Sequence, residues 1–258
     1  MMRYALPGGG SVLFTTRGHG NLSSVGGDGA ERGLESRERL REQVGVRRLL
    51  RGYQVHGTRV WRTDGDPREA GTGSRTATAG GGEVRPGAEI APDSDSEAQP
   101  EIEADGQATA LHGLGALVLT ADCLPVALGA NGAVAMVHAG WRGLSAGVIE
   151  EGVRALGELS GAGEIVAIIG PGAGPCCYEV GEEVHAAFGN AHRIGSPSAQ
   201  SPSTRNIDLK AIARDRLLAA GVEEVRDVEM CTICDERFFS HRREGARAGR
   251  QGGVAWLD

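Results

Sequence analysis

The chain has 258 residues, of which 40% are hydrophobic and only 4% aromatic, so it is long enough for one large domain whose core rests on aliphatic side chains. The formal net charge is −7, but residues 64–105 hold eleven acidic and three basic residues, so the remainder is nearly neutral and offers no broad basic face to a nucleic acid. No run approaches the ~18 apolar residues of a membrane span, which argues against a membrane protein.

The first part of the chain contains one expected helix and one expected disordered segment. Residues 1–14 hold no apolar stretch of the kind that a secretory signal needs. A helix is predicted over residues 36–44, with Ser36 as its N-cap and Gly45 as its stop. Residues 63–104 consist mainly of small, polar and acidic residues without periodicity, so we interpret them as a disordered acidic insertion.

After residue 105 the sequence alternates between strand-like and helix-like patterns. Strands are expected at residues 116–119, 133–137, 165–169 and 225–230. Helices are expected at residues 144–159, at 180–188, and from an Asp208 N-cap to residue 220. The alternation predicts a single α/β domain over residues 1–258, interrupted only by the acidic insertion.

Three chemically active side chains each follow an apolar run. Cys123 comes after residues 115–119, His138 comes after residues 133–137, and His56 comes after a shorter run. Because strands that end in polar, glycine-rich turns present their last side chains at a sheet edge, we expect these three to lie together. Two histidines and one cysteine suit a soft divalent metal ion with one coordination position left open for chemistry.

Polar residues beside these ligands are candidates for contacts with them or with a substrate. Asp122 and Arg142 flank Cys123 and His138, and either can orient a ligand or touch a substrate. The glycines around Trp141 and Arg142 leave room for a substrate to approach closely. The ordinary alternative for Arg142 is a surface salt bridge.

A second candidate site is the basic segment near the C-terminal end. Residues 237–250 hold five arginines and one glutamate, and Arg242 and Arg243 lie between aromatic residues and a glycine. Because arginine binds oxyanions through two parallel hydrogen bonds, the segment is a plausible phosphate site. The alternative is a solvated charged tail.

The other four cysteines give no clear metal signal. Cys231 and Cys234 have the spacing of half a zinc knuckle or of a redox pair, but no second pair of that spacing accompanies them. Cys176 and Cys177 are adjacent, and we interpret them as structural thiols. Five cysteines are an odd number in a chain too large to need stabilising disulfides, so we expect free thiols and a cytoplasmic protein.

Taken in order, these segments resemble one known family, the multicopper polyphenol oxidase or laccase-domain family. Its bacterial and animal members are described as zinc-dependent purine nucleoside phosphorylases. The resemblance covers nearly the whole chain outside the acidic insertion. The matching segments are residues 14–17, 54–58, 104–106, 120–126, 138–143, 169–171, 176–181, 208–209 and 238–245.

The resemblance implies a fold, a metal site and an activity. The fold would be a single α/β domain with β-sheets sandwiched between helices, and the zinc ligands would be His56, Cys123 and His138. The implied activities are phosphorolysis of adenosine, inosine, guanosine and methylthioadenosine, together with deamination of adenosine. Purine nucleosides and phosphate would be the partners, with Arg17, Arg242 or Arg243 holding the phosphate.

Two segments depart from the family pattern. The glycine-rich loop after Arg17 is shortened to residues 18–23, in which Asn21 and Leu22 keep the Asn-Leu pair of the family. His241 stands where the family usually has tyrosine. Both departures bear on substrate preference more than on the metal ligands.

Three other functions compete with the phosphorylase. A copper oxidase would use the same two histidines and cysteine, with Met136 near His138 in sequence, but the chain has seven histidines and no His-x-His pair. A metal-free hydrolase or deamidase would use Cys123 as nucleophile and His138 as base. A binding protein without catalysis would leave the metal position vacant.

Overall fold

The computed structural model describes residues 2–63, 102–161, 163–189 and 205–258, which are the subject of the structural statements below. Most of the predicted acidic insertion, residues 64–101, lies outside this part of the chain. Residues at both ends of the predicted insertion are described, and they take part in β-structure. Thr63 ends a strand, and Glu103 forms an isolated parallel bridge with Tyr53.

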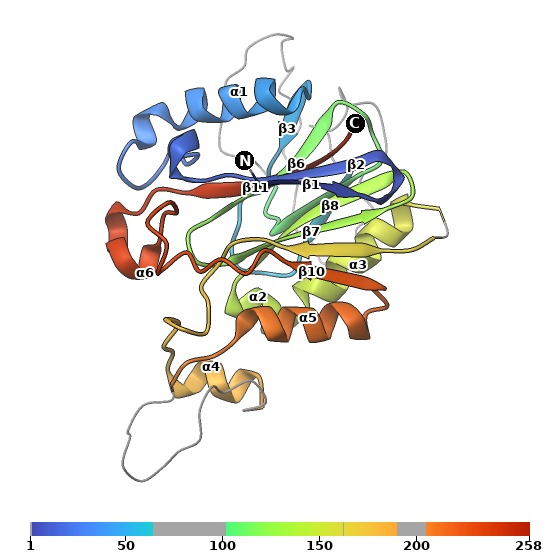
Figure 1. The fold of residues 1–258 in the computed structure, drawn as a ribbon. Helices are drawn as coiled ribbons and strands as arrows, with labels where there is room; N and C mark the ends of the chain where they lie inside the picture. The colour runs from blue at the N-terminus through green and yellow to red at the C-terminus, as the bar shows by residue number, and fades with distance from the viewer. Residues whose placement is uncertain (1, 64–101, 162, 190–204) are drawn as a thin grey trace, which may run out of the picture.

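Two β-sheets form the centre of the protein (Figure 1). The first has five strands in the order β1-β2-β11-β6-β3, and the second has six in the order β10-β9-β7-β8-β5-β4. The strands of the first sheet are β1 (Met2–Leu6), β2 (Gly10–Phe14), β3 (Arg48–Leu50), β6 (Leu114–Thr120) and β11 (Gln251–Leu257). The strands of the second are β4 (Val60–Thr63), β5 (Gly106–Thr109), β7 (Leu124–Ala130), β8 (Ala133–Ala139), β9 (Val166–Ile169) and β10 (Glu224–Asp227).

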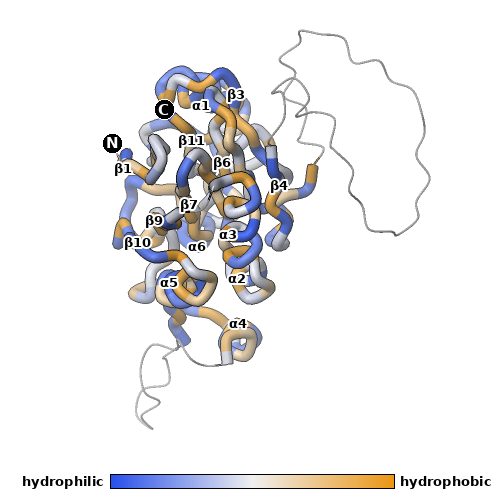
Figure 2. Tube along the Cα trace, turned by 90° about the vertical axis from the view of Figure 1, so that its right-hand side faces the viewer, coloured by the Kyte–Doolittle hydropathy of each residue, from blue (hydrophilic) through white to orange (hydrophobic). Residues whose placement is uncertain are grey.

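Helices cover the outer faces of both sheets, and the sheets pack against each other between them. Helix α1 (Gly33–Val44) covers the first sheet, while α3 (Val148–Leu159) and α5 (Leu209–Ala219) cover the second. Figure 2 gives a second view of these layers, with α1 at one end and α5 towards the other. The shorter helices are α2 (Trp141–Ala146), α4 (Glu182–Ala187), α6 (His241–Glu244) and the 3₁₀ turns Pro7–Gly9, Arg17–His19, Ala30–Arg32 and Gly245–Arg247. The predicted single α/β architecture, with β-sheets between helices, is confirmed.

The apolar runs of the central strands are continuous because both faces of these strands are buried. On β8, Val134 and Met136 pack between the two sheets, whereas Ala135 and Val137 pack against the helical layer with α3. The same alternation on β6 places Val118 between the sheets. Strand β6 belongs to the first sheet and β8 to the second, and the residues that follow β6 lead into β7, the neighbour of β8.

The strand β7 was missed by the sequence analysis. It lies between β8 and β9 in the second sheet, so the residues after Cys123 enter a central strand at once. Pro125 and Gly129 hid this strand, because proline removes a hydrogen-bond donor and glycine weakens a strand. Pro125 is tolerated as the second residue of β7, where its carbonyl still accepts from the N–H of Gly170 at 2.8 Å.

The predicted helix over residues 144–159 is two helices. It begins at Trp141, and Gly147, with φ of 103°, separates α2 from α3. Glycine adopts this left-handed conformation at little cost, so the chain changes direction there. The predicted start of α1 at Ser36 is also wrong, because the helix begins at Gly33 and Ser36 lies inside it.

Of the remaining predicted elements, β9, α4 and α5 are shorter than predicted and β6 and β8 are longer, and Asp208 caps α5 as expected. The strand predicted to residue 230 ends at Asp227, and Glu229 adopts φ of 55° as the chain leaves the sheet. All five cysteines are free thiols. Among the described residues, no helix has both the length and the apolar character needed to cross a membrane.

The N-cap of α5 gives a test of the fold. The Asp208 carboxylate accepts from the backbone N–H groups of Lys210 and Ala211, each at 3.0 Å. Asp208→Ala removes both acceptors and should lower the free energy of unfolding by about 1 kcal/mol. Asp208→Asn keeps an acceptor and is the control. Equal urea midpoints for the alanine variant and the wild type would show that the cap does not hold α5.

Candidate metal centre

The buried carboxylate of Asp105 holds two of the predicted ligand residues in place. Asp105 precedes β5 and is fully buried. Its Oδ1 accepts a hydrogen bond from His138 Nδ1 at 2.7 Å and from the backbone N–H of His56 at 3.0 Å. Its Oδ2 accepts from the backbone N–H groups of Val55 and Gly57, at 3.2 and 2.7 Å. One side chain therefore fixes a whole turn and the orientation of an imidazole ring.

His56 lies on that turn and not directly at the end of a strand. The strand β3 ends at Leu50, and Tyr53 and Val55 are nearly half exposed, so the expected apolar run before His56 is interrupted. His56 itself adopts φ of 60°, which is uncommon for a residue with a Cβ atom. The three N–H groups that bind Asp105 stabilise this conformation.

Cys123 is presented by a second left-handed turn, between β6 and β7. The preceding residue, Asp122, has φ of 93°. Its carboxylate accepts from Thr232 Oγ1 at 2.7 Å, from Ser240 Oγ at 3.1 Å and from the backbone N–H of Arg242 at 2.7 Å. Asp122 precedes Cys123 directly in the chain, and in this structure its oxygens bind the C-terminal loop.

The structure brings the three predicted ligands together. One ligand atom each from His56, Cys123 and His138 lies within 4.8 Å of the other two. Cys123 Sγ is 3.7 Å from His56 Nε2, and the two imidazole rings meet edge to face with centroids 4.9 Å apart. His138 is buried whereas His56 is exposed, so the group is reached from one side.

The electrostatics of the group favour a thiolate. Burial alone would raise the pKa of Cys123, but the charge of His138 and hydrogen bonds from both histidines outweigh it and lower the pKa to about 6. Burial alone would lower the pKa of His138, but the Cys123 charge and the Asp105 hydrogen bond raise it to about 9. Without a metal ion, Cys123 and His138 therefore form a thiolate–imidazolium pair.

Gly140 makes room for the side chains of His56 and Cys123. A Cβ atom at this position would lie 2.7 Å from His56 Cδ2 and 2.9 Å from Cys123 Sγ. The sequence analysis assigned the space around these glycines to a substrate. At Gly140 the space is taken by the side chains of His56 and Cys123, so any larger residue would push them apart.

The donor set fits a zinc ion. Zinc accepts imidazole nitrogen and thiolate sulfur, and three protein ligands leave its fourth position open for chemistry. Because Nδ1 of His138 binds Asp105, its other ring nitrogen is the one left for a metal, as in carboxylate–histidine–zinc arrangements. Two histidines and a cysteine also bind copper. Met136, the methionine considered for copper, packs between the two sheets.

Two of the predicted substrate contacts, Arg142 and Arg242, lie near Tyr178. The Arg242 guanidinium stacks on the Tyr178 ring at 5.3 Å and donates once, to the carbonyl of Glu179 at 2.7 Å. Arg142 stacks on Trp141 at 4.3 Å. Burial first, and then the nearby charge of Cys123, raise the pKa of Tyr178 to about 12, so its hydroxyl stays protonated.

Arg17 and Arg243 are occupied with the protein itself. Both donate to the carbonyl of Phe238 and to the Glu244 carboxylate. Arg243 also donates to the carbonyls of Thr232 and Ile233, at 2.8 Å each. These bonds brace the C-terminal loop and leave little of either guanidinium for a phosphate.

Asn21 is buried, and its side chain forms hydrogen bonds with backbone groups around its own loop. Its amide donates to the carbonyls of Gly26 and Asp28, and its oxygen accepts from the N–H groups of Ser23 and Arg250. Asn21 and Arg17 line a polar cavity of about 600 Å³ beneath α1, and none of the three metal-ligand candidates lines it. The structure therefore does not join Asn21 to the metal centre.

Sequence reasoning missed two residues of this region. Asp105 lies in the matching segment 104–106 and was assigned no role, although an acidic residue directly before a buried strand was an available signal. Tyr178 was hidden in the Cys176–Cys177 segment, and nothing in its local pattern connected it to Cys123. Tyr178 is brought to this region by a contact with Arg242, which is far away in the sequence, and sequence spacing cannot show such a contact.

Comparisons with known proteins find relatives in sequence and in fold. The sequence profile of the family described as "Multi-copper polyphenol oxidoreductase laccase" matches residues 9–258. A purine nucleoside phosphorylase of Xylella fastidiosa is 36% identical, over 97% of this chain and 88% of the relative. A protein named adenosine deaminase RL5, from an unknown prokaryote, is 34% identical, over 89% of this chain and 84% of its own length. The crystal structure of protein NMB0706 of Neisseria meningitidis superposes with a TM-score of 0.74 and 29% identity, covering 99% of this chain and 97% of the other.

Removal of the Asp105 charge tests its role in metal binding. Asp105→Asn turns an acceptor into an NH₂ group that faces backbone N–H groups, so His138 and the His56 turn lose their orientation. Metal affinity should fall by about 10- to 100-fold, as measured by competition with a chromogenic chelator. Glu224→Gln, on the outer strand β10, is the control. An unchanged affinity in Asp105→Asn would contradict the role of this carboxylate.

The thiolate of Cys123 can be tested in metal-free protein. Because its pKa is lowered to about 6, alkylation by iodoacetamide should rise through pH 6 and be near its plateau at neutral pH. An unperturbed thiol would rise near pH ~8.5 instead. Peptide mapping by mass spectrometry separates Cys123 from Cys176, whose pKa burial and neighbouring thiols raise to about 11. A Cys123 peptide that reacts only above pH 8 would exclude the ion pair.

Proposed function

The chain belongs to the multicopper polyphenol oxidoreductase laccase family, and we propose that it acts as a zinc-dependent purine nucleoside phosphorylase. Its substrates would be adenosine, inosine, guanosine or methylthioadenosine, together with inorganic phosphate. The observation that carries the proposal is the convergence of His56, Cys123 and His138 on one point beside the Asp105 carboxylate. The relative of Xylella fastidiosa that bears the name purine nucleoside phosphorylase matches nearly the whole chain.

Phosphorolysis breaks the bond between the purine and the ribose and forms a bond from the anomeric carbon to a phosphate oxygen. The products are the free purine, which takes up a proton, and ribose 1-phosphate. A bound zinc ion supplies a Lewis acid at its open position. The chain must supply an anion contact for the phosphate and a surface for the purine ring.

Arg242 is the best placed side chain for the phosphate. Its stack on Tyr178 and its single hydrogen bond to Glu179 orient the guanidinium and leave most of its N–H groups for an oxyanion. Arg142 is a second candidate, held by its stack on Trp141. The rings of Tyr178 and Trp141 offer aromatic surface for a purine.

Deamination of adenosine is a second activity that the relative named adenosine deaminase RL5 favours. In this reaction water replaces the amino group, and inosine and ammonia are formed. The chain has no His-x-Glu motif followed by Pro-Cys-x-x-Cys, so it does not follow the cytidine deaminase pattern. Its nucleophile would be a water activated at the same metal centre.

A metal-free reaction remains a distinct alternative because of the Cys123–His138 pair. A thiolate beside an imidazolium is the resting state of many cysteine nucleophiles. Copper in place of zinc would instead favour oxidation of phenols. Metal content and chelation therefore separate these functions from the phosphorylase.

The test combines metal analysis with product analysis. Purified full-length protein should carry zinc and convert adenosine and phosphate into adenine and ribose 1-phosphate, detected by chromatography. His56→Ala should lower this rate by more than about 100-fold, since loss of an outer partner alone costs about 10- to 100-fold. His112→Ala, at an exposed histidine bonded to the carbonyl of Asp258, is the matched control.

Three outcomes would contradict the phosphorylase proposal. Turnover that survives complete removal of metal would favour Cys123 as a nucleophile. Copper as the resident metal, with oxidation of phenols, would favour the oxidase. Inosine formed without phosphate, and no adenine with it, would make deamination the main activity.

A further inference from the structure

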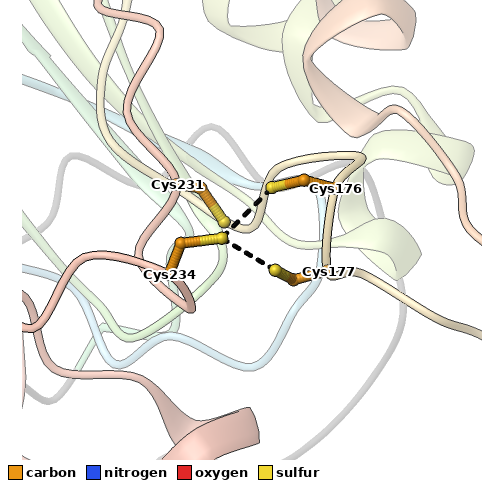
Figure 3. A group of neighbouring side chains, drawn as sticks. All are labelled: Cys176, Cys177, Cys231 and Cys234. Carbon is orange, nitrogen blue, oxygen red and sulfur yellow. Dashed lines mark hydrogen bonds between the residues drawn. The ribbon is translucent and has the colours of Figure 1, made fainter.

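The four cysteines outside the metal centre meet at one place, although they come from two distant segments (Figure 3). Cys176 and Cys177 follow β9, and Cys231 and Cys234 follow β10. Because β9 and β10 are parallel neighbours, both segments leave the same edge of the sheet. A bridge between Gly172 and Cys231 then continues the pairing beyond the strands.

The distances between the sulfur atoms suit a single metal ion. All four Sγ atoms lie within 4.8 Å of one another. Cys234 Sγ is 3.3 Å from Cys176 Sγ and 2.7 Å from Cys177 Sγ. A tetrahedral zinc ion with Zn–S bonds of about 2.3 Å requires sulfur atoms about 3.8 Å apart, which lies inside this range. Small rotations of the side chains would bring the four to that spacing.

The surroundings of Cys231 are those of a metal-bound thiolate. Its Sγ accepts a hydrogen bond from the backbone N–H of Gly174 at 3.2 Å, and from the backbone N–H groups of Ile233 and Cys234. Donors of this kind stabilise negative charge on a ligand sulfur. Gly174 is required here, because a Cβ atom would lie 3.0 Å from Cys231 Cβ.

The guanidinium of Arg243 also holds the segment that carries Cys231 in place. Arg243 donates to the carbonyls of Thr232 and Ile233, the two residues between Cys231 and Cys234. Four thiolates around a divalent ion leave a net charge of two negative units, and the guanidinium partly offsets it. The sequence analysis found no partner for the Cys231–Cys234 pair because the partner is an adjacent pair from another segment.

We propose that Cys176, Cys177, Cys231 and Cys234 form a second, closed metal site that binds zinc through four sulfur ligands. Four protein ligands leave no open position, so the role of this site is structural. It ties the loop after β9 to the loop after β10. These loops carry Tyr178, the stacking partner of Arg242, and Thr232, which binds Asp122.

The proposal does not depend on the proposed reaction, and metal analysis tests it directly. Wild-type protein, purified with reductant and without chelator, should contain two zinc ions per chain by mass spectrometry of the metal. X-ray absorption at the zinc edge averages over both sites. The first site has one sulfur ligand and the second has four, so the measured number of sulfur neighbours per zinc should lie between these values.

Two matched cysteine variants separate the sites. Cys123→Ala should keep one zinc ion, now with four sulfur neighbours. Cys234→Ser should also keep one, with mainly nitrogen neighbours. Because Cys234→Ser can fail to fold, the spectrum of Cys123→Ala is the decisive measurement, and it needs no activity.

Two results would overturn the second site. The first result is a wild type that carries only one zinc ion per chain together with a Cys123→Ala variant that carries none. This result would show that the four other thiols bind no zinc. A wild-type mass lower by two hydrogen atoms, with the bond mapped to Cys177 and Cys234, would show a disulfide in its place. Failure of the phosphorylase assay, with two zinc ions present, would leave this site standing.

Discussion

The candidate metal centre depends on the burial of one carboxylate, Asp105. A carboxylate removed from water is costly unless its oxygens are fully hydrogen-bonded. Asp105 meets this condition with the His138 ring and three N–H groups of the turn around His56, which lower its pKa although burial alone would raise it. The need to satisfy one buried charge therefore sets the turn, the tautomer of His138 and the direction in which both histidines face.

A second carboxylate, that of Asp122, orients the third candidate ligand, Cys123. Asp122 adopts a left-handed backbone conformation next to Cys123, as His56 does on its own turn. Such conformations are costly for residues other than glycine and persist only where their surroundings hold them. Here each is held by a carboxylate with several donors, Asp105 for His56 and Asp122 through Thr232, Ser240 and the N–H of Arg242. The C-terminal loop is therefore linked to the position of the thiol, although it contributes no ligand.

The sequence predicted several features that are local or periodic, but it missed the terminal strands β2 and β11 and features set by long-range packing. The alternation of buried strands and amphipathic helices predicted the layers. Polar residues after apolar runs predicted that the three candidate metal ligands lie together, although the run before His56 is interrupted in the structure. The strand β7 was missed because Pro125 and Gly129 are local signals against a strand, whereas its two neighbours in the sheet decide the outcome. The partner of Cys231 and Cys234 was missed for a related reason, since parallel β9 and β10 bring it from another segment.

The distribution of arginine contacts decides which positive charges remain for a substrate. A guanidinium that already donates to several carbonyls gains little from an anion, because each new hydrogen bond replaces an existing one. Arg243 is in this position, with three backbone carbonyls and Glu244 as partners, and Arg17 shares Phe238 and Glu244 with it. Arg242 differs because its backbone N–H is bound by Asp122 while its side chain is held by Tyr178 and a single carbonyl. The same residue is thus anchored to the turn of Cys123 while its side chain is exposed, so it is the arginine best placed to bind an anion near the candidate metal centre.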